Sequence, residues 1–371
     1  MKALITVTSL FIVVLLSGCL GSNNSSTAPI LAFAYVVGQG DNGIHAFTQT
    51  SIGDLQPLST ASFPTSPRPV SIAVHPSHNF LYVPNLTSNT VSGFNINHTT
   101  GVISPIGTAQ PPTPVQSQPV AVGFNSAGTF LYVLNQGSAS ISAFSVDPTH
   151  GLLTQIAGSP FPTAANPQSM AVSPSAGFLY VGNGALGTIS GFAIASDGSL
   201  APVAGSPFSA GASVTLAGIT IDPKGQFLYA ADSVNNKIVG FSIATGGALA
   251  TVAGSPFSAG TTPLAIAVDA TSSFLYSANQ GSNNVSAFKI NAGALTEIAG
   301  SPFGVVPAGA LDNSQPTFLA VDESNAFLYV GNLGTSNVTG FGINATTGVL
   351  GLLTDSPFPQ SIQPLWIVTT K

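Results

Sequence analysis

Short apolar segments separated by polar turns recur along almost the whole chain. Around Tyr82, segments of strand length lie at 69–74, 80–83, 91–96 and 102–106. The residues between them are rich in Asn, Ser, Thr, Pro and Gly, which favour turns over regular structure. Four such segments with turn signals between them predict a four-stranded antiparallel sheet.

This unit repeats with a period near 48 residues. All seven tyrosines of the chain stand at the same place in it, with spacings of 47, 50, 48, 49, 47 and 53 residues. A phenylalanine stands two positions before each tyrosine and another stands twelve positions after it. A fixed period of this length with several short strands predicts a radially repeated all-β array, a β-propeller. The tyrosines are Tyr35, Tyr82, Tyr132, Tyr180, Tyr229, Tyr276 and Tyr329.

Other positions repeat with the tyrosines. Proline opens the first strand in six of seven units, where the missing N–H is tolerated. Asn or Asp follows each tyrosine but the first by three positions, which predicts Asx turns in which the side chain caps its own backbone. A Gly-Ser-Pro-Phe sequence, once Asp-Ser-Pro-Phe, closes the fourth strand in five units.

The two ends of the repeat region complete one another. Residues 33–36 form a second strand with no first strand before it, and residues 364–368 form a first strand with no second strand after it. Pairing them leaves no open edge in the ring. The sequence therefore predicts a seven-bladed propeller over residues 31–371, closed by its C-terminal innermost strand.

The N-terminus has the features of a secretion signal. Lys2 precedes an apolar stretch at 3–16 that is too short to span a bilayer. The sequence Leu-Ser-Gly-Cys that ends at Cys19, the only cysteine, resembles a bacterial lipobox. The resemblance implies a signal peptide over 1–18, lipidation of Cys19 and a flexible tether over 19–30. We expect a lipid-anchored protein of the bacterial cell envelope, and Leu20 favours the outer membrane.

Composition narrows the classes of partner. Charged residues make up 5% of the chain, and Arg68 is the single arginine beside five lysines. Without a basic patch, nucleic acid is not an expected partner. The mature domain has no cysteine for a disulfide, so its core alone must hold it. We expect a monomer without a cofactor.

The motifs Phe-Leu-Tyr-Val-x-Asn, Gly-Ser-x-x-Ile/Val-Ser-x-Phe and Thr-Gly-x-Leu resemble the tyrosine–valine–threonine–asparagine (YVTN) repeat propellers. They also resemble lactonase-type seven-bladed propellers, which include one class of 6-phosphogluconolactonase. The similarity covers residues 31–370. It implies the fold and, for the lactonases, a set of His, Glu and Arg around the central channel. These motifs are turn and core positions, so they indicate fold more than function.

The residues available for catalysis are few. The two glutamates, Glu297 and Glu323, fall in a fourth strand and in a turn, and Asp147, Asp222, Asp269 and Asp322 read as turn formers. A phosphorylated sugar would need several Arg or Lys contacts. His75, His78, His98 and His150 lie on predicted turns and are interpreted as solvated, a metal site being the alternative. His45 falls in a third strand, where packing or hydrogen bonding is the simplest role.

The predicted channel mouth is the best candidate site. All seven residues that precede the innermost strands are polar, which indicates either solvation of the rim or ligand binding. They are Arg68, Gln118, Asn166, Thr215, Thr262, Gln315 and Gln363. In two neighbouring blades Phe318 and Trp366 replace a small residue, beside a long loop that carries Asp312. Either packing compensation or a binding surface for a neutral polar ligand explains them.

Two functions remain. The first is a non-catalytic binding or scaffold module at the channel mouth, for a glycan-like polar ligand or a protein. The second is a hydrolase that acts on a neutral lactone or ester. Convergence of Asp312, Glu297 and Arg68 at the channel would favour the hydrolase, because lactone opening needs a base and an oxyanion donor.

Overall fold

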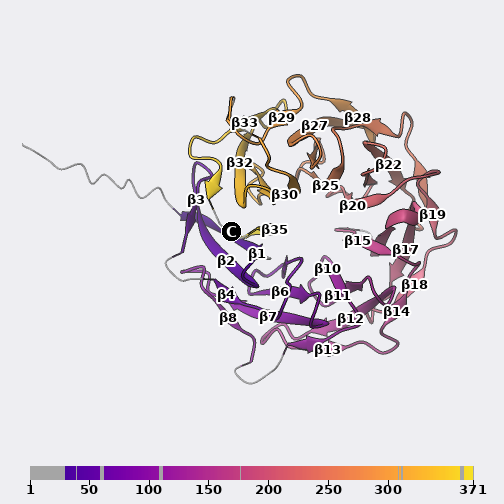
Figure 1. The fold of residues 1–371 in the computed structure, drawn as a ribbon. Coiled ribbons are helices and arrows are strands. Elements are labelled where there is room, and N and C mark those ends of the chain that lie inside the picture. The colour runs from indigo at the N-terminus through magenta and orange to yellow at the C-terminus, as the bar shows by residue number, and fades with distance from the viewer. Residues whose placement is uncertain are drawn as a thin grey trace, which may run out of the picture.

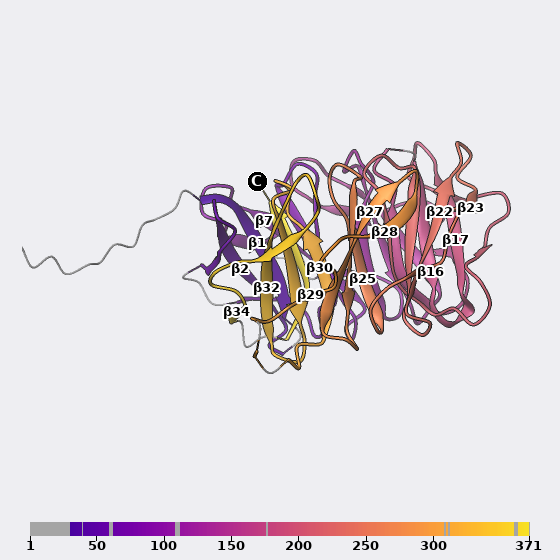
Figure 2. The same ribbon diagram turned by 90° about the horizontal axis from the view of Figure 1, so that it is seen from above.

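The computed structural model describes residues 30–38, 40–58, 62–107, 112–175, 177–307, 309–310, 312–359 and 363–370. The described residues form an all-β ring of seven sheets around a central axis (Figure 1). Seen from the side, the ring is a flat disc whose strands run between its two faces (Figure 2). The predicted seven-bladed propeller is confirmed. The predicted signal peptide over 1–18, the lipidated Cys19 and the tether up to residue 29 lie outside the described residues.

Each blade has four antiparallel strands on its main path. The innermost strands of blades 1 to 7 are β35 (Pro364–Thr370), β5 (Ala73–Val74), β10 (Pro119–Phe124), β15 (Pro167–Val172), β20 (Leu216–Ile221), β25 (Pro263–Val268) and β30 (Pro316–Val321). The second strands are β1 (Ile30–Gly38), β6 (Phe80–Asn85), β11 (Phe130–Asn135), β16 (Phe178–Asn183), β21 (Phe227–Asp232), β26 (Phe274–Asn279) and β31 (Phe327–Asn332).

The outer strands follow in the same order. The third strands are β2 (Gly43–Thr50), β7 (Thr90–Ile96), β12 (Ser140–Val146), β17 (Thr188–Ile194), β22 (Lys237–Ile243), β27 (Asn284–Asn291) and β32 (Asn337–Ile343). The fourth strands are β3 (Leu55–Pro57), β8 (Ile103–Pro105), β13 (Leu153–Gln155), β18 (Leu200–Pro202), β23 (Leu249–Thr251), β28 (Ala294–Glu297) and β33 (Leu350–Leu352). A 3-10 turn, η1 (Gly184–Leu186), joins β16 to β17.

A two-residue fifth strand pairs back onto the third strand of every blade. In five blades this strand contains the phenylalanine of the Gly-Ser-Pro-Phe or Asp-Ser-Pro-Phe motif, which therefore follows the fourth strand rather than closing it. In five blades the serine hydroxyl of the motif accepts the backbone N–H of the third strand, as Ser206 does from Gly191 at 2.9 Å. These strands are β4 (Phe63–Pro64), β9 (Thr113–Pro114), β14 (Phe161–Pro162), β19 (Phe208–Ser209), β24 (Phe257–Ser258), β29 (Phe303–Gly304) and β34 (Phe358–Pro359).

The two ends of the chain close the ring. Strand β35 pairs antiparallel with β1, from Phe33 opposite Thr370 to Gly38 opposite Pro364. Figure 1 shows yellow β35 beside indigo β1 at the centre of the ring. As predicted, blade 1 takes its innermost strand from the C-terminal part of the sequence.

The tyrosine ladder forms a ring of contacts between blades. Each tyrosine hydroxyl donates to the carbonyl of a glycine in the turn between the third and fourth strands of the next blade, at 2.5–3.1 Å. The bond from Tyr329 to Gly53 completes the circle. The phenylalanine two positions earlier packs on the same glycine: a Cβ on Gly101, at φ +69°, would lie 2.3 Å from the Phe33 ring. Only glycine fits there.

Burial follows the same plan. The buried apolar residues among the described ones form seven clusters, each joining two neighbouring blades. One position departs from the expected turn role: the Asn three residues after five of the tyrosines is fully buried and donates to a hydroxyl on the third strand, as Asn183 does to Ser190 at 3.0 Å. Asp232 alone accepts backbone N–H groups, from Thr215 and Asn235. In the described parts of the chain, no helix is long and apolar enough to cross a membrane.

Candidate functional site at the channel mouth

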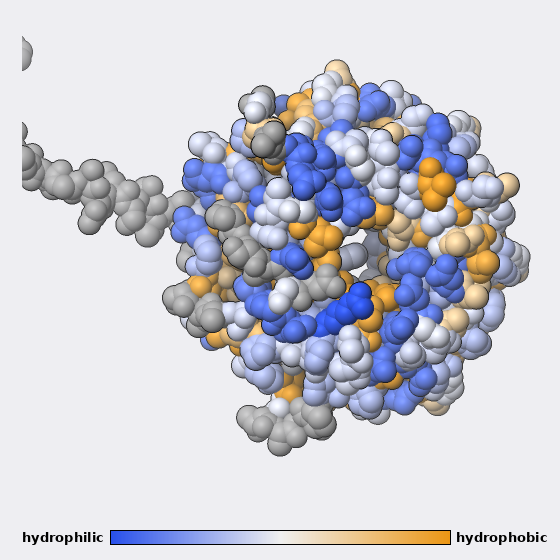
Figure 3. All heavy atoms as spheres, in the orientation of Figure 1, coloured by the Kyte–Doolittle hydropathy of each residue, from blue (hydrophilic) through white to orange (hydrophobic). Residues whose placement is uncertain are grey.

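The residues before the innermost strands lie on one rim of the channel. Five of them, Arg68, Gln118, Asn166, Gln315 and Gln363, are exposed, and Thr215 and Thr262 are half-buried. All except Thr215 adopt a left-handed backbone conformation, with φ between 47° and 60°. This conformation turns the incoming loop sharply into the strand. Figure 3 shows one face of the ring, where hydrophilic and hydrophobic residues lie side by side around the central opening.

Neighbouring blades hold this rim in place. The asparagine of the turn between the second and third strands accepts the backbone N–H of the rim residue of the next blade, at 2.7–2.9 Å. The pairs are Asn42 with Arg68, Asn89 with Gln118, Asn236 with Thr262 and Asn283 with Gln315. Because these bonds use the backbone, the exposed side chains remain directed to solvent.

Phe318 and Trp366 form a stacked pair on neighbouring innermost strands. Their ring centroids lie 6.5 Å apart with an interplanar angle of 18°. Phe318 is 2% exposed and lies over Gly331, where a Cβ would come within 1.7 Å of the ring. Trp366 is 41% exposed. Because β35 is the innermost strand of blade 1, we interpret the exposed part of the indole as facing the channel.

The candidate acid–base residues do not come together. The Asp312 carboxylate accepts the backbone N–H and the hydroxyl of Ser314, at 3.1 and 2.6 Å, so it forms a local turn. Glu297 ends the outermost strand of blade 6 and accepts the hydroxyl of Ser301 at 2.9 Å. Arg68 lies on the inner rim. Glu297 is therefore on the circumference, away from the other two residues.

Residues at the rim, or on the innermost strands just after it, in three consecutive blades form what we call the aromatic sector. It comprises Asp312, Gln315 and Phe318 of blade 7, Gln363 and Trp366 of blade 1, and Arg68 of blade 2. The sequence indicated these positions one by one as irregularities of the repeat. It did not show that Trp366 would stack on Phe318, because that contact depends on the ring closure. Whether these residues bind a ligand stays a prediction.

The opposite rim is formed by the turns between first and second strands. Asp222, Asp269 and Asp322 accept backbone N–H groups of their own turns, which confirms them as turn formers. Asp147 does the same for the third-to-fourth-strand turn of blade 3. Blade 1 has no such connection, because its two inner strands come from opposite ends of the repeat. There His78 of blade 2 and Glu323 of blade 7 meet, with Nε2 and Oε1 at 3.2 Å.

The interpretation of His75 as a solvated turn residue is wrong. His75 is 7% exposed and packs edge-on against Phe80 and Phe124. Its Nε2–H donates to the Gly128 carbonyl at 3.0 Å, and its Nδ1 accepts from Ser77. Desolvation lowers the pKa of His75, a smaller effect of His78 acts in the same direction, and the Gly128 hydrogen bond opposes both.

The other histidines have separate partners. His45 contacts Asp41 at 2.8 Å, His98 contacts Asn79 at 2.8 Å, and His150 contacts Asp147 at 3.4 Å. Among the described residues, no group of three or more His, Cys, Asp or Glu side chains is placed to hold a metal ion. The arrangement offers amides, one guanidinium and one aromatic face rather than a metal centre.

Solved structures share this architecture. A candidate 6-phosphogluconolactonase from Bacteroides uniformis is 18% identical, with a TM-score of 0.76 over 91% of this chain and 99% of that chain. Another from Bacteroides fragilis is 17% identical, with a TM-score of 0.77 over 93% and 99%. The periplasmic gluconolactonase of Pseudomonas aeruginosa is 16% identical, with a TM-score of 0.71 over 92% and 99%. At these identities the likeness shows the fold alone.

Sequence comparison identifies the family more directly. No curated protein sequence matches the chain. The family model described as lactonase, 7-bladed beta-propeller matches residues 28–165 and 167–310, more than half of the chain. The protein therefore belongs to the seven-bladed β-propeller lactonase family.

Proposed function

We propose that the protein binds a neutral, hydroxyl-rich ligand of the sugar or sugar-lactone type at the aromatic sector, without hydrolysing it. The observation that carries this proposal is the indole of Trp366, 41% exposed and fixed on Phe318. A rigid aromatic face with polar groups beside it suits a ligand that has both apolar faces and hydroxyl groups. The side chains of Arg68, Gln315 and Gln363 supply the donors and acceptors on the same rim.

The distribution of charge argues against a phosphorylated ligand. Arg68 is the single arginine of the chain. Of the described lysines, Lys224 lies in a turn on the opposite rim, and Lys237 and Lys289 lie on third strands. Phosphate recognition normally uses several cationic or bidentate contacts. One guanidinium matches a neutral polyhydroxylated molecule better than a sugar phosphate.

The location is part of the proposal. A lipid on Cys19, with the tether that follows, would hold the propeller at the bacterial envelope, with the outer membrane as the favoured site. Two or more acyl chains anchor a protein stably, whereas one does not. The periplasmic location named for the Pseudomonas neighbour is consistent with an extracytoplasmic protein.

Lactone hydrolysis is the second candidate, and the family match favours it. In that case Asp312 would be the candidate base and Arg68 the candidate oxyanion donor. The Asp312 carboxylate is already held by Ser314, which leaves it poorly placed as a base. For this reason the binding function is preferred.

Intrinsic fluorescence tests the binding function directly, because Trp366 is the single tryptophan of the chain. Titration of the full-length protein with neutral monosaccharides, oligosaccharides and glucono-1,5-lactone should give a saturable change in emission. In calorimetry, Trp366→Ala should weaken binding at least tenfold, or about 1.4 kcal/mol. Lys289→Ala, on the outer part of blade 6, is the matched control and should bind like the wild type.

The same samples separate the two candidates. With glucono-1,5-lactone in a pH-stat, the binding function predicts no turnover above the uncatalysed rate. Turnover that is lost in Arg68→Ala or Asp312→Ala would establish the hydrolase instead. If neither turnover nor saturable binding appears with any of these ligands, both candidates fail.

A further inference from the structure

One blade lacks an aromatic side chain that the other six share. The first residue of each fifth strand pairs with an Ile or Val of the third strand. In six blades this residue is Phe, whereas in blade 2 it is Thr113, opposite Val91. The six phenylalanines are Phe63, Phe161, Phe208, Phe257, Phe303 and Phe358.

The phenyl ring normally covers the third strand. A Cβ built on Gly191 or Gly240 would lie 3.2 or 3.3 Å from the ring of Phe208 or Phe257, closer than ordinary van der Waals contact, so the ring packs tightly on the glycine. Gly93 is the equivalent residue of blade 2, because it pairs with Tyr82 as Gly191 pairs with Tyr180. The three heavy atoms nearest to a Cβ there belong to Ile106 and Tyr82, and none belongs to Thr113. The fifth strand of blade 2 therefore does not cover this glycine as a phenyl ring does in blades 4 and 5.

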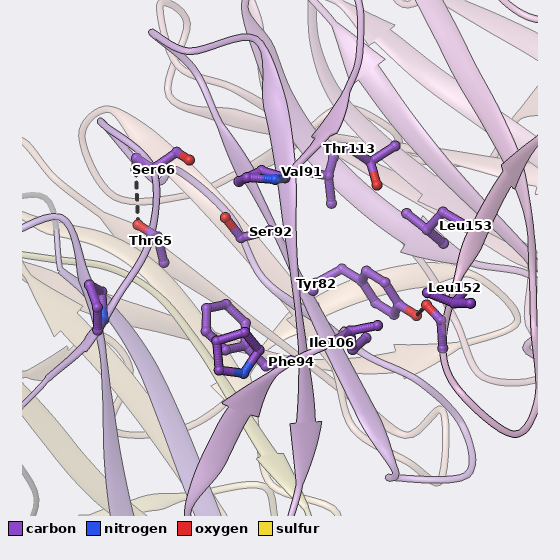
Figure 4. A pocket seen from close by; sticks show the side chains of 15 residues that line it. Thr65, Ser66, Tyr82, Val91, Ser92, Phe94, Ile106, Thr113, Leu152 and Leu153 are labelled. Carbon is purple, nitrogen blue, oxygen red and sulfur yellow. Dashed lines mark hydrogen bonds between the residues drawn. The ribbon is translucent and has the colours of Figure 1, made fainter. Parts of the chain in front are cut away.

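A cavity of about 350 Å³ occupies this position. Its apolar wall is formed by Tyr82, Val91, Ile106, Leu152 and Leu153, and Thr113 stands at its edge. Figure 4 shows these side chains around an open space, together with Thr65 and Ser66 from the connection between blades 1 and 2. The cavity thus lies against the outer strands of blade 2, between the connection from blade 1 and the third-to-fourth-strand turn of blade 3, rather than at the channel mouth.

We propose that this cavity is a second binding site, for a small molecule that carries one phenyl ring with a hydroxyl or similar polar substituent. The repeat itself identifies the ring: the same position is filled by a phenyl group in six other blades. An apolar cavity of about 150 Å³ suffices to hold benzene. Buried against Tyr82, the ring would gain an edge-to-face contact in addition to area burial. The hydroxyl of Thr113 lies where the substituent would face solvent.

Substitution of the edge residue tests the site. Phenol and benzyl alcohol are the probes, and their binding to the full-length protein is measured by saturation-transfer NMR and calorimetry. Cyclohexanol and glucose serve as comparison ligands. Thr113→Phe should abolish binding of both aromatic probes and raise the melting temperature, because the cavity is then filled as in the other blades. Emission from Trp366 should not respond to these probes, which separates this site from the rim.

A second variant provides the matched control. Phe208→Thr opens the equivalent position in blade 4 and should add one further binding site of similar affinity, with a lower melting temperature. If Thr113→Phe does not fold, Thr113→Leu fills part of the same space and should weaken binding at least fivefold. The proposal is overturned if the wild type shows no saturable binding of phenol or benzyl alcohol. It is equally overturned if the folded filled variant binds them like the wild type.

Discussion

The contacts between blades and the contacts at the channel rim follow different rules. Between blades, the same Tyr–Gly hydrogen bond occurs seven times, including the pair that joins the last complete blade to the first. At the rim, three consecutive blades differ from the rest by carrying Phe318, Trp366 and the one arginine. Interfaces that must fit identical neighbours repeat, because each blade can bury its faces only against the next one. At the rim, neighbouring blades bond to the backbone N–H groups, so the exposed side chains are free to vary.

Opening the ring at the blade interface should have the largest effect on the stability of the protein. A chain that ends at Gln363 lacks β35 and leaves the inner edge of β1 unpaired, together with the buried Phe318 that stacks on Trp366. An unpaired edge and an open interface favour association over a closed monomer. We expect loss of the cooperative thermal transition in circular dichroism and aggregation in analytical ultracentrifugation. A chain that ends at Thr370 is the control, and equal melting of the two chains would contradict the prediction.

Breaking one member of the tyrosine ring should have the next largest effect. Tyr180 is fully buried, and its hydroxyl donates to the Gly247 carbonyl at 2.7 Å. Removing the whole side chain in Tyr180→Ala should lower the free energy of unfolding by about 3–5 kcal/mol. Tyr180→Phe removes only the hydrogen bond and leaves a buried acceptor, which should cost about 1–3 kcal/mol. Urea titration measures both values, and equal losses in the two variants would show that ring packing contributes little.

The smallest expected effect is a dependence of stability on pH. It comes from His75, which blade 2 alone has at this turn position. The pKa of His75 is lowered in the folded protein, so the unfolded chain binds its proton more tightly. The contribution of His75 to stability is therefore fully present above about pH 6.5, the usual pKa of a histidine. It is lost as the pH falls below that value. Protonation of Nδ1 would also break the bond from Ser77.

The repeat supplies the matched replacement for that test. Asn125 occupies the same turn in blade 3, where its side-chain oxygen accepts the Phe130 N–H at 2.9 Å. In His75→Asn, the fall in melting temperature between pH 7 and pH 5 should be smaller than in the wild type. Parallel pH profiles for the two proteins would exclude His75 as the cause.

The repeat made most of the fold predictable and little of the site. Tyr, Phe and Gly recur because each has one fixed partner across a blade interface, so their spacing gave blade number, strand order and closure. His75 was misread because a turn position predicts exposure, whereas the rings of Phe80 and Phe124 cover it in space. His78 pairs with Glu323, which lies far from it in the chain. The two meet beside blade 1, which has no turn between its first and second strands. No local pattern contains that information.

The sequence by itself determined the propeller, the identity of the blade that joins the two ends, and the scarcity of charge at the rim. These follow from periodicity and residue counts, which do not depend on long-range geometry. Only the tertiary structure decided that Trp366 lies on Phe318, that Glu297 stands apart from Arg68 and Asp312, and that Thr113 leaves a cavity where six blades have a phenyl ring. These facts depend on which side chains meet when the ring closes, and close packing makes them specific to position.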